Sequence, residues 1–290
     1  MSITTEDIKL LRESTGAGVL DCKKALQETN GDMDAAIEYL RKKGLAAAAK
    51  KASREAKEGE VSARVSDDRK IGAMVKVNCE TDFVARTDEF RNFVATLVQQ
   101  MQEQPHVQNL ETLLAAPYLG DSSKTVSQQL TELIAKLGEN MIVRDAARFD
   151  LAGDGMIDNY VHMEGRVGVL VEVGGSEPGN PKFAEFVHDL ALQIAAASPR
   201  YVAPQDAPAE VVEAEKAIYR AQLAEDKKPD NIKERIIEGK LNKWYAETTL
   251  LNQEFVKDSS LTISQLRDKY SKELGVDLTI RRFARFELGG

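Results

Sequence analysis

Side chains that could perform chemistry are few in this sequence and widely spaced. Its three histidines are His106, His162 and His188, and its two cysteines are Cys22 and Cys79. None of them stands at the spacing of a metal site, and the motifs HExxH, GxSxG, GxGxxG and GxxxxGK(S/T) are absent. Acid and base groups can be distributed over a fold, so this absence makes an enzyme less expected without excluding one. These residues indicate no cofactor site and no metal site.

The most unusual side chains occur in the segment VNCETDFVARTDEF, residues 77–90. An exposed Phe83 would forgo the stabilisation that burial gives an aromatic ring, and the adjacent Asp82 carboxylate could compete for a cation or a hydroxyl group. One interpretation places Phe83 in the core of its own chain, with Asp82 capping the helix that follows. Thr87 and Asp88 are better caps for that helix, which favours an outward-facing Asp-Phe tip.

An internal duplication indicates the elements that position this loop. IGAMVKV (71–77) recurs as VGVLVEV (167–173), and SKTVSQQLTELIAKLG (123–138) recurs as SLTISQLRDKYSKELG (260–275). The alternating apolar residues of the first pair predict strands, and each copy has the order strand, strand, helix, helix, strand. This order predicts an α+β fold in which helices pack on antiparallel sheets.

The two copies differ in two places, and unshared features are candidates for function. The strand-to-helix loop at 77–90 is longer than VGGSEPGNPKF (173–183) in the second copy. The second copy has extra residues between about 198 and 250, with two helical patterns around a turn at Pro229. We expect a helical hairpin at 200–248 that docks either on its own domain or on another chain.

The chain before the duplication has a helical pattern of its own. Three short helices are expected up to residue 44, with breaks at residues 16–18 and 30–31. Residues 45–58, LAAAAKKASREAKE, are rich in alanine and basic, which is typical of a solvated helical linker. The basic residues of 41–57 leave RNA binding as the alternative function, although no aromatic residue interleaves the charges.

Length and composition suit a protein of several parts. The 290 residues are 42% hydrophobic and 30% charged, and the net charge of −8 disfavours a surface built to bind nucleic acid. No apolar run reaches the roughly 18–20 residues of a membrane span, and the N-terminus lacks the pattern of a secretory signal. We expect a cytoplasmic protein without a membrane or direct nucleic-acid partner. Its parts are a module with linker at 1–55 and α+β subdomains at 56–151 and 152–290.

Four long segments resemble the bacterial elongation factor Ts family. They are residues 14–44, 77–86, 137–149 and 160–173, and the second of them reads VNCETDFVAR. The resemblance implies a guanine-nucleotide exchange factor that binds elongation factor Tu and is not itself an enzyme. It also implies a ubiquitin-associated-like module of three helices, two related α+β subdomains and an inserted helical hairpin. That hairpin would serve a homodimer or a heterotetramer with elongation factor Tu.

The resemblance also assigns roles to individual residues. Asp82 and Phe83 would intrude beside the magnesium and phosphate site of the partner, with Thr81 and Val84 next to them in the same contact. The N-terminal residues expected to contact the partner's nucleotide-binding domain are Arg12, Val19 and Leu20. His162 would approach another domain of the partner. Two methionines are common in the family where this sequence has Val19 and Leu20, so the apolar character is kept and the flexible thioether is lost.

Overall fold

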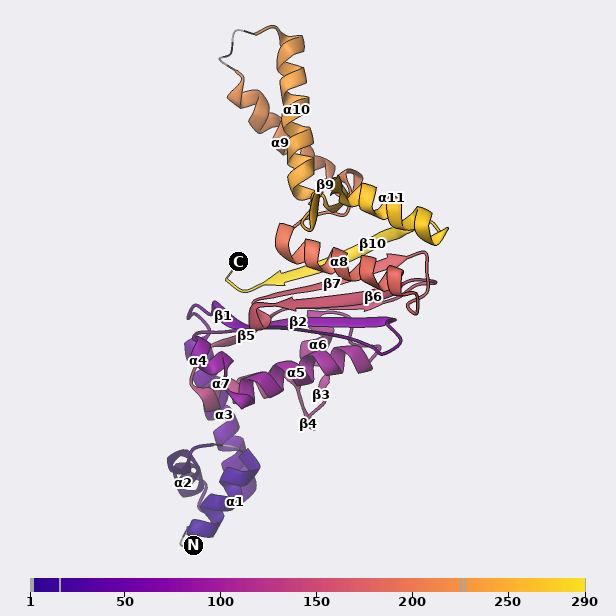
Figure 1. The fold of residues 1–290 in the computed structure, drawn as a ribbon. Coiled ribbons are helices and arrows are strands. Elements are labelled where there is room, and N and C mark those ends of the chain that lie inside the picture. Colours follow the sequence, from indigo (N-terminus) through magenta and orange to yellow (C-terminus); the bar gives the residue numbers. More distant parts are fainter. Residues whose placement is uncertain (1–2, 16, 225, 227, 290) are drawn as a thin grey trace.

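The computed structural model of the chain describes residues 3–15, 17–224, 226 and 228–289. The molecule is elongated: N-terminal helices form one end, two sheets between layers of helices form the middle, and a helical hairpin forms the other end (Figure 1). The three-stranded sheets are antiparallel, and helices cover their outer faces, so the predicted α+β class is confirmed. None of the described helices is both long and apolar enough to cross a membrane.

Three helices make up the N-terminal end: α1 (Thr5–Thr15), α2 (Val19–Glu28) and α3 (Met33–Lys51). They enclose a small core of Leu11, Cys22, Ala25, Leu26 and Ala36. Asp32 caps α3, because its carboxylate accepts a hydrogen bond from the Ala35 backbone N–H at 2.9 Å. The expected breaks separate the three helices, although Gly16 lies outside the described residues.

The third helix is longer than the sequence indicated. It does not end near residue 44 but runs through the alanine-rich stretch to Lys51. Alanine has the highest helix propensity, and the single internal Gly44 costs only about 1 kcal/mol. The last turns of α3 pack against α7 (Val126–Leu137), where Ala48 joins the core and Lys51 Nζ donates to the Ile134 carbonyl at 3.4 Å. Residues 45–51 of the linker are therefore helical as expected, but they are fixed against the core and not solvated on all sides. Residues 52–57 are not helical, and Glu58 begins the first strand, so the expected helix is wrong for the second half of the linker.

The first sheet has three antiparallel strands in the order β1-β2-β5: β1 (Glu58–Val65), β2 (Ile71–Cys79) and β5 (Met141–Asp150). Three helices cover its outer face: α5 (Asp88–Glu103), α6 (Leu110–Ala115) and α7. Side chains of β2 alternate as the sequence predicted. Val75 and Val77 pack under the helices, whereas Met74 packs towards the second sheet.

The second sheet repeats this arrangement in the order β10-β7-β6: β6 (Met156–His162), β7 (Val167–Gly174) and β10 (Thr279–Glu287). Its outer face is covered by α8 (Pro181–Ala197) and α11 (Ile263–Leu274). Phe183 and Phe186 of α8 are buried under this layer as Phe90 and Phe93 of α5 are under the first. The duplication inferred from the sequence is therefore a duplication of structure.

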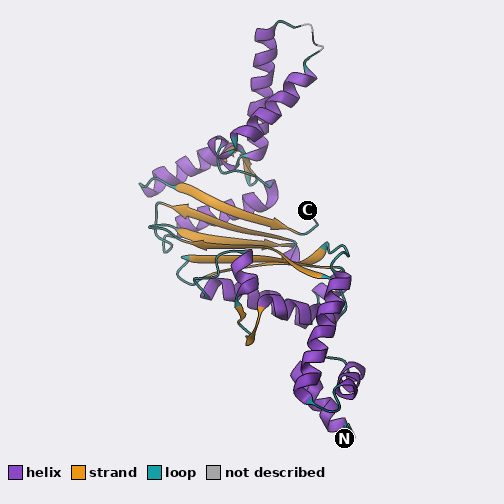
Figure 2. Ribbon diagram, turned by 180° about the vertical axis from the view of Figure 1, so that it is seen from behind, coloured by secondary structure: helices purple, strands orange, loops and turns teal. Residues whose placement is uncertain are grey.

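The two sheets pack face to face between the helical layers (Figures 1 and 2). Glycines at matching positions of the two central strands permit this close approach. A Cβ atom on Gly72 would lie 2.7 Å from Ile157 Cγ2, and one on Gly168 would overlap Val61. These two glycines of the repeated strand motif therefore serve the packing of one sheet on the other.

The repeated Thr-(Val/Ile)-Ser-Gln segments are helix N-terminal caps. Thr125 and Gln128 exchange hydrogen bonds between side chain and backbone at the start of α7, and Thr262 and Gln265 do the same at the start of α11. A short hairpin precedes each cap: β3 (Pro117–Tyr118) with β4 (Asp121–Thr125), and β8 (Glu254–Phe255) with β9 (Asp258–Thr262).

The insertion in the second copy is a helical hairpin of α9 (Ala209–Gln222) and α10 (Asp230–Thr248), which projects away from the sheets. Its root is flanked by η2 (Pro204–Asp206) and η3 (Leu250–Asn252), and Leu250 N donates to the Tyr201 carbonyl at 2.9 Å. The rings of Trp244 and Tyr201 pack at a tilted angle, with 6.4 Å between their centroids. Further out, Ile218 is 51% exposed. Within the described part of the hairpin, these contacts with its own domain lie at the root.

Candidate functional site

The Asp-Phe segment is a single helical turn, α4 (Asp82–Ala85), between β2 and α5. Thr81 caps this turn by accepting a hydrogen bond from Val84 N, and Thr87 caps α5 by accepting one from Phe90 N. The turn between these two caps carries Phe83 outward, with 80% of its surface exposed. The interpretation that buried Phe83 in its own core is therefore wrong.

Residues distant in sequence hold this turn in place. The Glu139 carboxylate accepts hydrogen bonds from Thr81 N at 3.0 Å and from Thr81 Oγ1 at 2.6 Å. The next residue, Asn140, donates from its backbone to Glu80 and from its side chain to the Arg54 carbonyl. The role of Glu139 and Asn140 was not expected from the sequence, although both lie in the segment 137–149, one of the four that show the family resemblance. No local pattern indicates that this segment meets the loop.

The four side chains of the α4 tip, those of Thr81, Asp82, Phe83 and Val84, divide into a packed pair and an exposed pair. Val84 packs against the core of the first sheet, and Thr81 is engaged by Glu139. Asp82 is about half exposed and pairs with Arg86 at 3.3 Å, one turn later in the chain. Such an exposed pair is weak, so the Asp82 carboxylate can exchange this partner for another at little cost. The tip therefore presents one aromatic ring and one available carboxylate.

The titratable side chains beneath the α4 tip are not arranged for nucleophilic catalysis or metal binding. Burial raises the pKa of Cys79 to about 12, and the nearby Glu139 charge acts in the same direction. The thiol is therefore neutral at physiological pH and a poor nucleophile. Burial also raises the pKa of Glu60 on β1, and Arg91 opposes this effect. In the described part of the chain no three His, Cys, Asp or Glu side chains are grouped as metal ligands.

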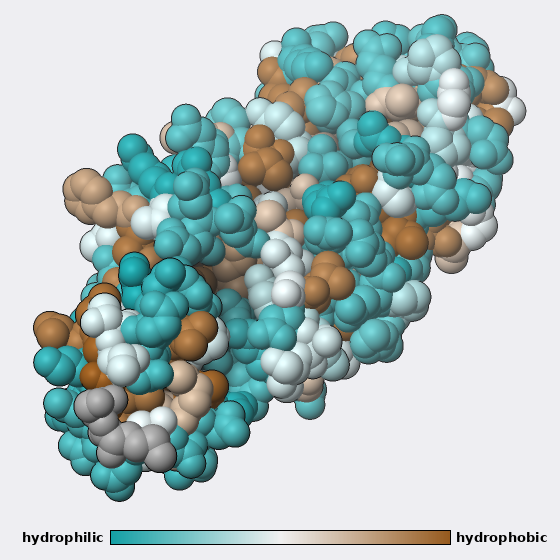
Figure 3. All heavy atoms as spheres, turned by 90° about the horizontal axis from the view of Figure 1, so that it is seen from below, coloured by the Kyte–Doolittle hydropathy of each residue, from teal (hydrophilic) through white to brown (hydrophobic). Residues whose placement is uncertain are grey.

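The N-terminal candidates lie on a second surface. Val19 and Leu20 open α2 and are 52% and 82% exposed, and Arg12 is exposed in the last turn of α1. Further exposed apolar side chains of this end are Leu10, Ile37 and Leu45. The view onto the N-terminal end shows apolar side chains interrupting its hydrophilic surface (Figure 3). This surface stands at the far end of α3 from α4 (Figure 1).

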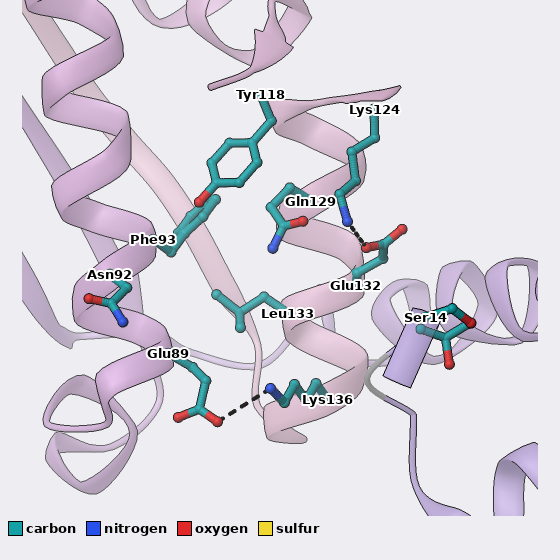
Figure 4. A pocket seen from close by; sticks show the side chains of 11 residues that line it. Ser14, Glu89, Asn92, Phe93, Tyr118, Lys124, Gln129, Glu132, Leu133 and Lys136 are labelled. Carbon is teal, nitrogen blue, oxygen red and sulfur yellow. Dashed lines mark hydrogen bonds and ion pairs between the residues drawn. The ribbon is translucent and has the colours of Figure 1, made fainter. Parts of the chain in front are cut away.

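A cavity of about 330 Å³ lies between these surfaces, next to the end of α1. Side chains of α5 and α7 face each other across it, and Lys136 pairs with Glu89 at 3.3 Å (Figure 4). Lys124 pairs with Glu132 at 2.6 Å on its other side. The cavity is lined by none of the residues that the sequence singled out, and its charged groups are paired with one another.

His162, the last candidate, ends β6 and is exposed. Its Nδ1 lies 2.9 Å from the Tyr160 hydroxyl, and the two rings stack with centroids 5.7 Å apart. The turn that follows, η1 (Met163–Gly165), contacts β1, and α4 contacts β1 as well. The structure thus brings His162 and the α4 tip to one end of the sheets, whereas the α2 residues remain apart.

Comparison with known proteins decides the family. The family model described as elongation factor TS matches residues 80–290. The elongation factor Ts of Trichlorobacter lovleyi is 47% identical over 293 residues, covering 100% of this chain and 93% of the relative. The chain belongs to the elongation factor Ts family. Elongation factors Ts from Clostridium perfringens strain SM101 and Aquifex aeolicus are 49% and 45% identical, over 99% and 100% of this chain and 93% and 99% of the relatives.

Membership of the elongation factor Ts family places the chain among the translation elongation factors, as the resemblance implied. The RNA-binding alternative is not favoured. The stretch 41–57 on which it rested is mostly part of α3, whose last turns are packed against α7.

Proposed function

We propose that this chain binds elongation factor Tu and promotes release of GDP by disturbing the magnesium and phosphate site of that partner. The observation that carries the proposal is the conformation of the α4 tip. Thr81 and Thr87 cap the helices on either side of it, and the Phe83 side chain, 80% exposed, projects outward beside the Asp82 carboxylate. An exposed aromatic ring on an ordered turn is stabilised only when a partner covers it. The chain makes and breaks no covalent bond, and it acts in the cytoplasm.

The mechanism is a coupling of two binding equilibria. GDP is held tightly on a GTPase because magnesium bridges its phosphates and protein oxygens. Phe83 packs beside this site and favours a shifted loop, and the Asp82 carboxylate perturbs the magnesium shell. Since coupling is reciprocal, GDP weakens the binding of this chain by the factor by which the chain weakens GDP. Arg12, Val19, Leu20 and His162 contribute affinity at other points of the partner.

The direct test follows labelled GDP leaving elongation factor Tu in the presence of excess unlabelled GDP. We expect release to accelerate with increasing chain concentration and to reach a plateau. Binding of the chain to elongation factor Tu should weaken as GDP is added. A chain that binds the GTPase without accelerating release would contradict the proposal.

Asp82→Ala is expected to reduce the rate of promoted GDP release by about tenfold when magnesium is present, which is the scale of one charged contact. The reduction should shrink when magnesium is chelated, because no metal shell then remains to be perturbed. The measurement is GDP release with and without chelator. Thr81 remains as the cap of α4, so thermal unfolding should change little. An equal defect in both conditions would remove Asp82 from the magnesium mechanism.

The hairpin of α9 and α10 is proposed to join copies of the chain in a homodimer or heterotetramer, and to be dispensable for exchange. We expect a variant with residues 212–240 replaced by a Gly/Ser linker to keep promoted GDP release within about twofold. The root keeps Trp244 and the Leu250–Tyr201 hydrogen bond, so the domain should remain closed. Sedimentation of the variant reports its oligomeric state. If the folded variant binds the GTPase but releases no GDP, the hairpin belongs to the exchange mechanism.

A further inference from the structure

The turn between β6 and β7 has an unusual backbone. Its three residues Met163, Glu164 and Gly165 all have positive φ, at 50°, 53° and 93°. Glycine is required at the third position, because a Cβ atom there would lie 2.8 Å from Glu60 Cγ on β1. The first two positions carry long side chains, for which this left-handed region is unfavourable.

Met163 differs from the other residues in this conformation. The remaining described non-glycine residues with positive φ are Asn30, Arg69, Glu164 and Ser198, and all of these have polar side chains. Met163 has an apolar side chain that is 62% exposed, and none of the apolar clusters of the described chain includes it. Burial within this chain therefore does not offset the cost of its backbone conformation.

The position of the turn relates Met163 to the α4 tip. Arg166, which follows the turn, pairs with Glu58 at the start of β1 at 3.2 Å. Glu58 is in register with Cys79, the last residue of β2, and α4 follows shortly after it. Since η1 and α4 both contact β1, the exposed side chains of Met163 and Phe83 stand on elements that flank one strand.

We infer that Met163 is a further apolar contact of this chain with the GTPase that Phe83 contacts. The inference rests on the proposed function. The partner that covers Met163 is the one that contacts Phe83, because the turn lies at the same end of the sheets as the α4 tip and directly follows His162. The flexible thioether side chain of Met163 adapts to an apolar surface of that partner and is covered by it. The strained turn lowers the folding stability of the free chain, and the exposed Met163 side chain increases the affinity for the partner.

The test uses the full chain and elongation factor Tu without nucleotide. Met163→Gly is expected to weaken binding about tenfold, the effect of withdrawing one partly buried apolar side chain. It should also raise the melting temperature of the free chain by about 2–4 °C, because glycine adopts positive φ freely. Met163→Leu keeps an apolar side chain on the same strained backbone and should bind within about threefold of the parent. Opposite changes in stability and affinity are a result that a purely structural residue does not give.

Glu164→Gly is the matched control, because it relieves the same strain one residue later and leaves Met163 in place. It should raise the melting temperature and leave binding unchanged. Unchanged binding of Met163→Gly, beside defective GDP release by Phe83→Ala, would overturn the inference and leave the proposed function standing. A lowered melting temperature of Met163→Gly would also overturn it, because Met163 would then pack within its own chain. Normal exchange by Phe83→Ala would instead contradict the proposed function.

Discussion

Replacing Phe83 with alanine is expected to slow the GDP release that this chain promotes from elongation factor Tu by about 10- to 100-fold, the range that corresponds to losing one buried aromatic contact. The stability of the free chain should hardly change, because 80% of the Phe83 surface is already exposed. Thr81 and Thr87 still cap the flanking helices, so α4 keeps its shape in the variant. The measurements are labelled GDP release at saturating chain and denaturant unfolding of the chain alone.

Two control variants distinguish loss of a partner contact from loss of folding stability in Phe83→Ala. Val256→Ala removes apolar surface from another exposed side chain, in the turn between β8 and β9, and should leave exchange unchanged. Phe90→Ala removes a fully buried ring and should lower the free energy of unfolding by about 3–5 kcal/mol. If Phe83→Ala unfolds as readily as Phe90→Ala while its folded fraction exchanges normally, Phe83 is a core residue and the proposed mechanism fails.

The double substitution of Val19 and Leu20 by alanine is expected to raise the chain concentration needed for half-maximal exchange by about 10- to 100-fold, since two exposed apolar contacts are withdrawn. The maximal rate of GDP release should be unchanged. Val19 and Leu20 open α2, at the far end of α3 from α4, so they can supply affinity without touching the site that α4 disturbs. The measurement is the dependence of the release rate on chain concentration.

Substitution tests this anchoring role better than deletion of residues 1–50 does. Such a deletion would remove nearly all of α3, whose Ala48 packs on the core and whose last turns lie against α7. Alanine at the start of α2 favours the helix, and the buried side chains of α2 are untouched. Val256→Ala, which alters an exposed position in the turn between β8 and β9, again serves as the control and should leave the concentration dependence unchanged. A reduced maximal rate at saturating double variant would show that α2 takes part in displacing GDP.

Several features of this protein are determined by the sequence because their causes lie within a few residues. Alternation along 71–77 and 167–173 assigned the central strands correctly, since the side chains of a strand point alternately to its two faces. Thr125 and Thr262 cap their helices through groups three residues away, so the repeated motif marks both helix starts. Thr87 as the better cap indicated an outward Phe83 for the same local reason.

The tertiary structure alone decided where these elements meet. Glu139 holds Thr81 across 58 positions of the chain, and nothing near either residue specifies that pair. Residues 45–51 of the alanine-rich stretch are helical as expected, but helix propensity carries no information about packing against α7. The placement of Met163 beside the strand that α4 also contacts depends on sheet-to-sheet packing across Gly72 and Gly168. Helix caps and strand alternation are fixed by neighbours along the chain. The position of Met163 relative to the α4 tip is fixed by close packing between elements that come together only when the chain folds.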